Sequence, residues 1–259
     1  MSDVLQNTLE NGIRTLTLNR PERRNALSSP LVSDLKTALQ AVRNDGDTRA
    51  IILTGAGDKV FCAGADLNPA QMGGGVLAGH QARHDFVALL RAFKNTGVPI
   101  IAKLQGHVLA GGVGLLAAAD LAIAADDIYV QTPELNVGLF PMMIMSLIAR
   151  NVGRKHALEL LLTAEKFPAQ EAHRMGLINR VVPRADLDAQ THALATRLAS
   201  FSPAILQLGR DAYYAMEDMP LDPALDYLCG QLSLNTMTED AAEGVMAFIQ
   251  KRAPEWKGK

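Results

Sequence analysis

One carboxylate stands out in the 259-residue sequence because its neighbours are apolar. Glu134 is the lone acid of residues 133–141. A carboxylate that becomes buried has a raised pKa and can act as a general base near neutral pH. A surface or helix-capping role is the other explanation for a lone glutamate, and the segment alone leaves both open.

Two segments rich in small residues could hold a negatively charged oxygen beside such a base. The first, residues 61–67, has glycine and alanine where backbone N–H groups could approach a ligand closely. The second, residues 106–114, follows a buried apolar run and opens a helix, whose first N–H groups favour negative charge. One N–H from each would form an oxyanion hole. A tight turn would explain either segment alone.

Apolar periodicity predicts an α/β chain that becomes helical toward its C-terminus. The predicted strands are 4–9, 13–18, 50–54, 99–104, 121–124 and 129–130. The predicted helices are one that begins at Pro30 with Ser29 as its N-cap, then 79–95, 111–118, 148–162, 169–175, 187–198, 204–217 and 224–249. The strands fall mostly before residue 131, so the candidate chemistry lies in the α/β part.

The composition excludes several classes of protein. Hydrophobic residues make up 48% and charged residues 20%, as in globular proteins. The net charge of -2 lacks the basic excess of a general nucleic-acid binder, so no nucleic-acid partner is expected. Two cysteines give no disulfide framework, and no cysteine or histidine cluster indicates a metal. No signal peptide or run of membrane-spanning length is evident, which predicts a cytoplasmic protein without a membrane partner.

In their order and spacing, the segments 18–21, 25–27, 61–67, 106–114 and 133–138 resemble the crotonase superfamily, also called the enoyl-CoA hydratase/isomerase family. The likeness continues to Lys251 and Arg252. It implies an α/β fold, a crotonase-type spiral of strand–strand–helix repeats that carries an acyl-CoA site over residues 1–195. Residues 196–259 would form a C-terminal helical region for oligomerisation as homotrimers or hexamers.

The resemblance also implies roles for individual residues. The backbone N–H groups of Ala65 and Gly111 would hold the thioester oxygen, and Glu134 would be the base. No metal or redox cofactor is implied, because CoA arrives as part of the substrate. The positions implied for CoA binding are Arg24, Ala26, Ala63, Asp66 and Leu67, with Lys251 reaching the CoA of a neighbouring subunit.

The sequence departs from the family's hydratases at Gly114, where they carry a second glutamate that helps to hold the attacking water. Residues 142–145 also replace a glycine-rich turn that helps to seat the water. A single glutamate resembles the Δ3,Δ2-enoyl-CoA isomerases, whose chemistry needs one base, and this is the favoured activity. The alternatives are 2-enoyl-CoA hydration, in fatty-acid or branched or aromatic acid breakdown, and a non-catalytic acyl-CoA-binding scaffold. RNA binding, reported for some relatives, is disfavoured by the charge.

Other polar residues have a catalytic and a structural explanation. Asp66 and His107 could replace the missing acid, although a structural role is expected for each. His80 and His84 are expected on a solvated helix face, and Cys62 as a small packing residue. The apolar run 142–148 would either line the acyl pocket or belong to the core.

Overall fold

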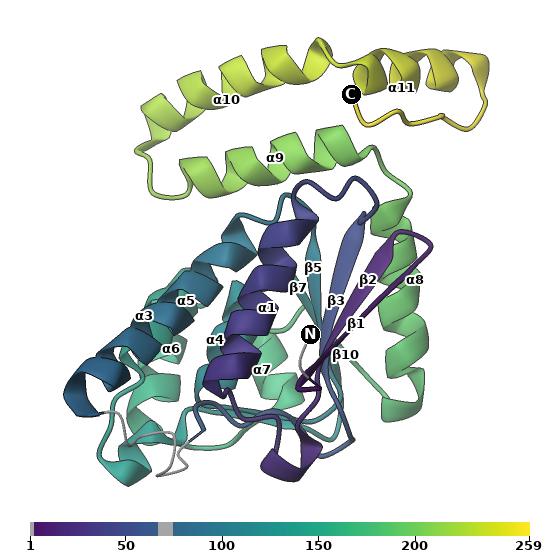
Figure 1. Ribbon diagram of the computed structural model, residues 1–259. Coiled ribbons are helices and arrows are strands. Elements are labelled where there is room, and N and C mark those ends of the chain that lie inside the picture. The colour runs from purple at the N-terminus through teal and green to yellow at the C-terminus, as the bar shows by residue number, and fades with distance from the viewer. Residues whose placement is uncertain (1–2, 67–74) are drawn as a thin grey trace.

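The computed structural model describes residues 3–66 and 75–259, and within them helices and two sheets form a mixed α/β fold (Figure 1). The six-stranded sheet has the order β1-β2-β3-β5-β7-β10 and the four-stranded sheet the order β4-β6-β8-β9. The first contains β1 (Leu5–Glu10), β2 (Ile13–Leu18), β3 (Ala50–Gly55), β5 (Ile100–Leu104), β7 (Leu121–Ala125) and β10 (Arg180–Val182). The second contains β4 (Val60–Cys62), β6 (His107–Leu109), β8 (Tyr129–Gln131) and β9 (Phe167–Pro168).

Successive turns of the chain add one strand to each sheet. β3 and β4, β5 and β6, and β7 and β8 follow one another directly, and each pair leads into helical structure. From β2 to β10 the neighbouring strands of the large sheet are parallel. Parallel strands are covered on both faces, which explains why every residue of β3 is buried. This arrangement confirms the predicted α/β spiral of strand–strand–helix repeats.

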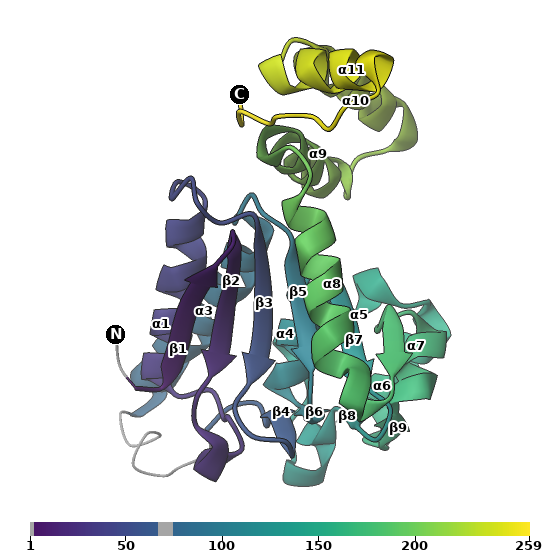
Figure 2. The same cartoon turned by 90° about the vertical axis from the view of Figure 1, so that its right-hand side faces the viewer.

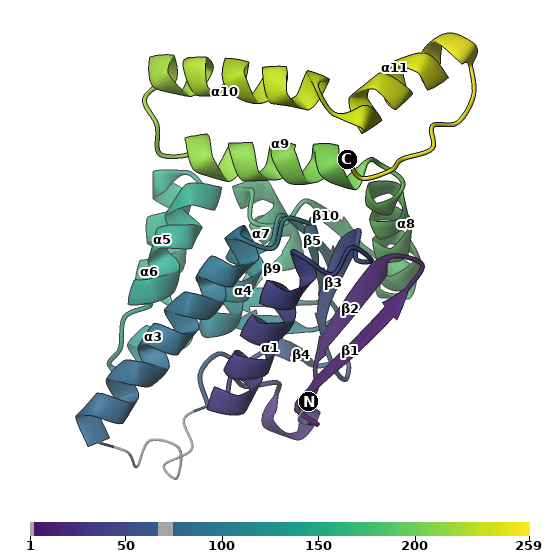
Figure 3. The ribbon, with the colours of Figure 1, turned by 45° about the horizontal axis from the view of Figure 1, so that its top comes forward.

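Helices cover both faces of the large sheet, with α1, α3 and α4 on one face and α8 on the other (Figure 2). Helices α9, α10 and α11 lie beyond one end of that sheet (Figure 3). The α-helices are α1 (Ser29–Val42), α3 (Gly75–Lys94), α4 (Gly111–Ala118), α5 (Met142–Asn151), α6 (Arg154–Thr163), α7 (Ala169–Met175), α8 (Leu187–Ala199), α9 (Pro203–Met216), α10 (Leu221–Thr236) and α11 (Glu239–Gln250). Short 3-10 helices are η1 (Pro21–Arg23), η2 (Pro133–Val137) and η3 (Arg184–Asp186).

Some predicted boundaries are wrong for local reasons. Ser28, not Ser29, is the N-cap of α1, because its side chain accepts the Leu31 N–H at 3.4 Å. The predicted helix over 148–162 is broken between α5 and α6, and the one over 224–249 between α10 and α11, where the Thr238 side chain caps α11. β4, β6, β9 and β10 were not predicted, because strands of two or three residues show little periodicity; of the strands this short, only β8 was predicted.

The C-terminal helices are attached to the α/β core through a partly buried carboxylate. Asp120 accepts hydrogen bonds from the Ile100 N–H at 2.7 Å, the Tyr214 hydroxyl at 2.6 Å and the Arg210 Nε at 3.0 Å. Tyr214 and Arg210 lie on α9, so one side chain joins that helix to the start of β5. Helix α8 runs across the predicted boundary at 195/196 and packs on the sheet, and the division at that position stays a prediction.

Asp120→Ala is expected to lower the free energy of unfolding by about 3 kcal/mol, because it leaves the largely buried Arg210 charge without its partner. The matched control is Asp211→Ala on α9, the helix that carries Arg210. It removes the solvent-accessible ion pair with Arg43 and should cost about 1 kcal/mol or less. Urea unfolding of both variants measures the difference. Equal losses would show that Asp120 does not anchor α9.

Candidate active site

The first predicted oxyanion segment forms a short parallel bridge with the chain before α1. The Leu27 N–H donates to the Gly64 carbonyl at 2.7 Å, and the Asp66 N–H donates to the Leu27 carbonyl at 3.2 Å. Successive N–H groups of an extended chain point to opposite sides. The two Leu27 bonds use the Gly64 carbonyl and the Asp66 N–H, and the N–H of Ala65 between them takes no part in this bridge.

The second segment places a strained residue directly before Gly111. Ala110 is the N-cap of α4 with φ 49° and ψ −125°, a region that costs a non-glycine residue about 1–3 kcal/mol. Its N–H donates to the Gln131 carbonyl at 3.0 Å, which holds the start of α4 against β8. The first N–H groups of a helix have no partner within it. The Gly111 N–H is therefore directed out of the helix start, and sequence analysis gave no signal for the strain at Ala110.

Gly64 allows the two segments to meet. Its φ of +85° is one that L side chains rarely adopt. A Cβ there would lie 2.5 Å from the Ala110 Cβ and 2.8 Å from the Gly111 N. The structure thus packs Gly64, the residue before Ala65, directly against Ala110 and Gly111, so that the two predicted segments meet.

Glu134 lies in η2, three residues after the carbonyl that holds Ala110. Its Oε2 is buried and has no hydrogen-bond partner among the described residues. Burial raises the pKa of this carboxyl above its ordinary value of 4.5, and a hydrogen bond from its own backbone N–H opposes that rise. The Thr132 hydroxyl bonds the Leu160 carbonyl and holds the strand end that leads into η2. A carboxyl of raised pKa with one oxygen free to take a proton has the properties of a general base.

Gly114, where hydratases carry the second acid, lies directly against α5. A Cβ at Gly114 would be 2.4 Å from the Ile144 Cγ2 and 3.5 Å from the Phe86 Cζ. Ile144 is buried at 3% exposure, so it cannot simply swing into solvent. The space that a glutamate at residue 114 would need is therefore filled by hydrocarbon.

Gly114→Ala is expected to lower the free energy of unfolding by about 1–3 kcal/mol, the usual cost of overpacking a core. Gly209→Ala is the matched control, since Gly209 also lies within a helix but has open space around a Cβ. Removing that glycine should stabilise α9 by roughly 0.5–1 kcal/mol. Thermal or urea unfolding compares the two. If Gly114→Ala left the free energy of unfolding unchanged, α5 would be able to move aside at little cost.

The residues before α1 are arranged by a buried asparagine that sequence analysis treated only as part of a motif. The Asn25 side chain accepts the Arg20 N–H at 3.0 Å and donates to the carbonyls of Ala56 at 3.0 Å and Val60 at 2.8 Å. Arg24 is exposed with φ 53°, and its carbonyl accepts the Ala63 N–H at 3.1 Å. The loop is therefore tied directly to β4.

The other residues predicted to bind CoA lie in different environments. Ala26 is buried at 8% exposure and lies beside Arg24. Asp66 forms a largely buried ion pair with Arg20 at 2.8 Å, which makes it part of the loop's framework. Leu67 lies outside the described residues. Lys251 is the C-cap residue that directly follows α11. Helix α11 lies at the opposite end of the molecule from β4 and β6 (Figure 2), so a single chain does not bring Lys251 to the other residues.

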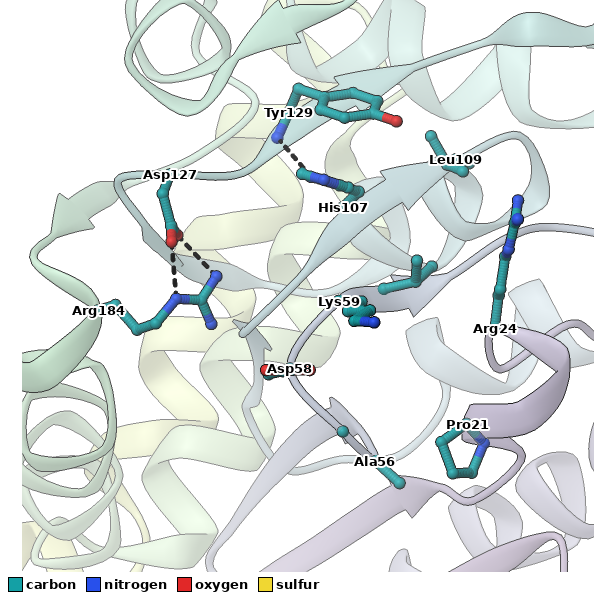
Figure 4. Close-up of a pocket in the computed structure, with 12 residues that line it drawn as sticks. Pro21, Arg24, Ala56, Asp58, Lys59, His107, Leu109, Asp127, Tyr129 and Arg184 are labelled. Atoms are coloured by element: carbon teal, nitrogen blue, oxygen red, sulfur yellow. Dashed lines mark hydrogen bonds and ion pairs between the residues drawn. The ribbon is translucent and has the colours of Figure 1, made fainter.

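A cavity of about 530 Å³ opens beside Arg24 (Figure 4). Lys59 and His107 also line it, and neither Ala65, Gly111 nor Glu134 does. The His107 Nδ1 accepts the Tyr129 N–H at 3.2 Å, and the two rings stack at 3.8 Å. Desolvation, and then the charge of Lys166, lower the pKa of His107, so this histidine is held neutral by its surroundings.

The expected structural roles of the remaining residues agree with their environments. Cys62 is fully buried, and burial raises the pKa of its thiol to about 12. His80 and His84 are exposed on α3. Ile144 and Ile148 of the predicted pocket-or-core run are buried, whereas Met142 is exposed. Among residues 3–66 and 75–259, no group of three or more His, Cys, Asp or Glu side chains could hold a metal ion.

None of the described helices combines the length and the apolar character needed to cross a membrane.

Comparison with known proteins gives relatives along the whole chain. The rat and human proteins named "Enoyl-CoA hydratase domain-containing protein 3, mitochondrial" are 37% and 35% identical, each over 95% of this chain, and 82% and 80% of their own lengths are covered. These mitochondrial names contradict the expectation of a cytoplasmic protein. The solved structure of an enoyl-CoA hydratase from Mycobacterium smegmatis has a TM-score of 0.94 at 34% identity and covers 98% of this chain and 99% of its own.

The structure of the human enoyl-CoA hydratase domain-containing protein 3 likewise has a TM-score of 0.94 at 33% identity, over 98% of this chain and 100% of its own. These neighbours confirm the fold expected from the resemblance. The family model described as "Enoyl-CoA hydratase/isomerase" matches residues 8–259. Since the match spans nearly the whole chain, the protein belongs to the enoyl-CoA hydratase/isomerase family of enzymes.

Proposed function

We propose that this protein isomerises 3-enoyl-CoA thioesters to 2-enoyl-CoA thioesters with Glu134 as its single base. The observation that carries the proposal is the combination of a partly buried Glu134 carboxyl, whose buried Oε2 has no hydrogen-bond partner among the described residues, with a Gly114 position closed by Ile144. The first supplies a base of raised pKa. The second removes the place for the second acid that water addition would use.

The proposed reaction transfers one proton from C2 to C4 through Glu134, with no net uptake or release of protons. Glu134 takes the proton from C2, the C–H bonding pair forms the C1–C2 double bond, and the carbonyl π pair moves onto the thioester oxygen. The N–H groups of Ala65 and Gly111 would hold this charge, which is larger in the dienolate than in the substrate. When the carbonyl re-forms, the double bond shifts to C2–C3 and C4 takes the proton back from Glu134. This scheme needs no metal or redox cofactor.

Hydration is the main alternative, since relatives are named enoyl-CoA hydratases. Water addition requires a positioned water and a proton donor besides Glu134. Asp66 is engaged by Arg20, and His107 is fixed by Tyr129 and kept neutral. Both substitutes named from the sequence therefore have structural partners, which favours the one-base reaction.

The proposal also includes how CoA is bound and how the subunits associate. Arg24 and Lys59, which line the same cavity, would supply positive charge to the CoA phosphates. Several large apolar side chains on α9–α11 are exposed, among them Leu221 at 73% and Phe248 at 84%. Such a face is suited to self-association, and we propose that residues 196–259 pack between subunits and bring Lys251 to a neighbour's CoA.

The test is turnover of the purified protein with a 3-enoyl-CoA and, separately, with the matching 2-enoyl-CoA. We expect conversion of the 3-enoyl ester to be much faster than hydration of the 2-enoyl ester. Hydration at a comparable rate would overturn the proposal in favour of a hydratase. Tight acyl-CoA binding without turnover of either ester would overturn the proposal in favour of a non-catalytic acyl-CoA-binding scaffold.

A further inference from the structure

Beyond this reaction, we propose that His80 and His84 form a two-histidine site for a divalent late transition metal ion such as Ni²⁺ or Cu²⁺. The two residues are four apart on α3, so they lie one above the other on the same helix face. Both side chains are exposed. Their Nε2 atoms are 3.0 Å apart, with the ring planes at 74°. The two Nε2 atoms therefore already lie close together on the solvent-exposed face of α3.

The separation of the two nitrogens matches the bite of a chelated ion. With metal–nitrogen bonds of about 2.0–2.1 Å, a 3.0 Å separation corresponds to an N–metal–N angle of roughly 91–97°. That angle is narrower than the tetrahedral angle that zinc prefers. It is close to the right angle of square-planar or tetragonal sites, which is the geometry of Cu²⁺ and Ni²⁺ with nitrogen ligands.

Binding requires the Nε2 lone pairs of both imidazoles to face the ion. At 3.0 Å one Nε2 donates its hydrogen to the other, so a single Nε2 proton lies between the rings. When the ion binds, that proton moves to Nδ1 of the same imidazole and both Nε2 lone pairs face the metal. Water fills the remaining positions, which agrees with the finding that the described residues contain no group of three metal-ligating side chains.

The site lies where α3 has little other support. The buried residues of this helix are Phe86, Leu89, Ala92 and Phe93, all after His84, whereas Val76 and Leu77 before it are 89% and 80% exposed. The start of α3 projects away from the sheets (Figures 1 and 3). An ion that links residues 80 and 84 would close one helical turn and oppose fraying there.

Isothermal titration of the full protein with Ni²⁺, and electron paramagnetic resonance with Cu²⁺, would test the site. We expect one ion per chain, bound about 10²-fold more weakly after either His80→Gln or His84→Gln, because each leaves a single ligand where two acted together. His192→Gln is the matched control, an exposed histidine on α8 without a second histidine one turn away. Mg²⁺, which prefers oxygen ligands, should not bind there.

Hydrogen exchange gives a second readout that does not depend on activity. Saturating Ni²⁺ should slow exchange of the amides in the first turns of α3 in the wild type and not in His80→Gln/His84→Gln. Binding that persists in this double variant, or that falls equally in His192→Gln, would show an adventitious ion only and overturn the proposal. Isomerase turnover in the double variant should stay unchanged, because neither ring belongs to the proposed catalytic group.

Discussion

Glu134→Gln is expected to reduce kcat for isomerisation by about 10²–10⁴-fold, the usual contribution of a positioned general base. The amide has the shape of the carboxyl but cannot take the C2 proton. Glu171→Gln is the matched control, since this partly exposed glutamate on α7 is paired with Arg174 and lies outside the proposed site. Turnover of a 3-enoyl-CoA measures both. An active Glu134→Gln would remove Glu134 from the mechanism.

The same variant should not lose stability. Burial raises the folded-state pKa of Glu134 above its ordinary value of 4.5. The folded protein therefore holds this proton more tightly than the unfolded chain, and stability falls as the pH rises from that value through the raised one. Glu134→Gln removes this cost, so at neutral pH its melting temperature should equal or exceed that of the wild type.

The pH dependence of the wild type provides an independent check. Because the base must be ionised, kcat/KM should fall as the pH drops through the raised pKa, and the acidic limb of the profile should lie above pH 4.5. A combined loss of activity and stability in Glu134→Gln would instead indicate a structural glutamate.

Gly64→Ala is expected to damage catalysis through the backbone. The added methyl would lie 2.5 Å from the Ala110 Cβ and 2.8 Å from the Gly111 N, so the two oxyanion segments must move apart. Loss of one such donor costs about 10²–10³ in kcat. The overlap also lowers the free energy of unfolding by about 1–3 kcal/mol.

The control for this prediction is Gly46→Ala. Gly46 has a similar positive φ of +72° but nothing within 4 Å of a Cβ, so it carries the backbone strain without displacing a neighbour. It should lose some stability and keep its kcat. Full activity in a folded Gly64→Ala protein would show that the N–H groups of Ala65 and Gly111 are not the oxyanion donors.

Features that depend on local residue order were predictable. The Asn11-Gly12 turn between alternating strands indicated the β1–β2 hairpin, and the apolar run before Gly55 indicated a strand buried on both faces. Helices α4 and α7 begin and end where their patterns predicted. Periodicity reports which face of an element is buried, and this depends on neighbours along the chain. It did not mark the breaks after α5 and α10, which are only two residues long and each contain one apolar residue, Val152 and Met237.

The sequence by itself therefore determined the order of the elements, the lone acid at Glu134 and the lack of a second acid at Gly114. Only the tertiary structure decided what those residues contact. Ile144 fills the space beside Gly114 from 30 positions away in the chain, and Arg20 engages Asp66 across 46. The strain at Ala110 likewise follows from the pairing of β6 with β8. Contacts between distant segments depend on register and packing, which no local pattern encodes.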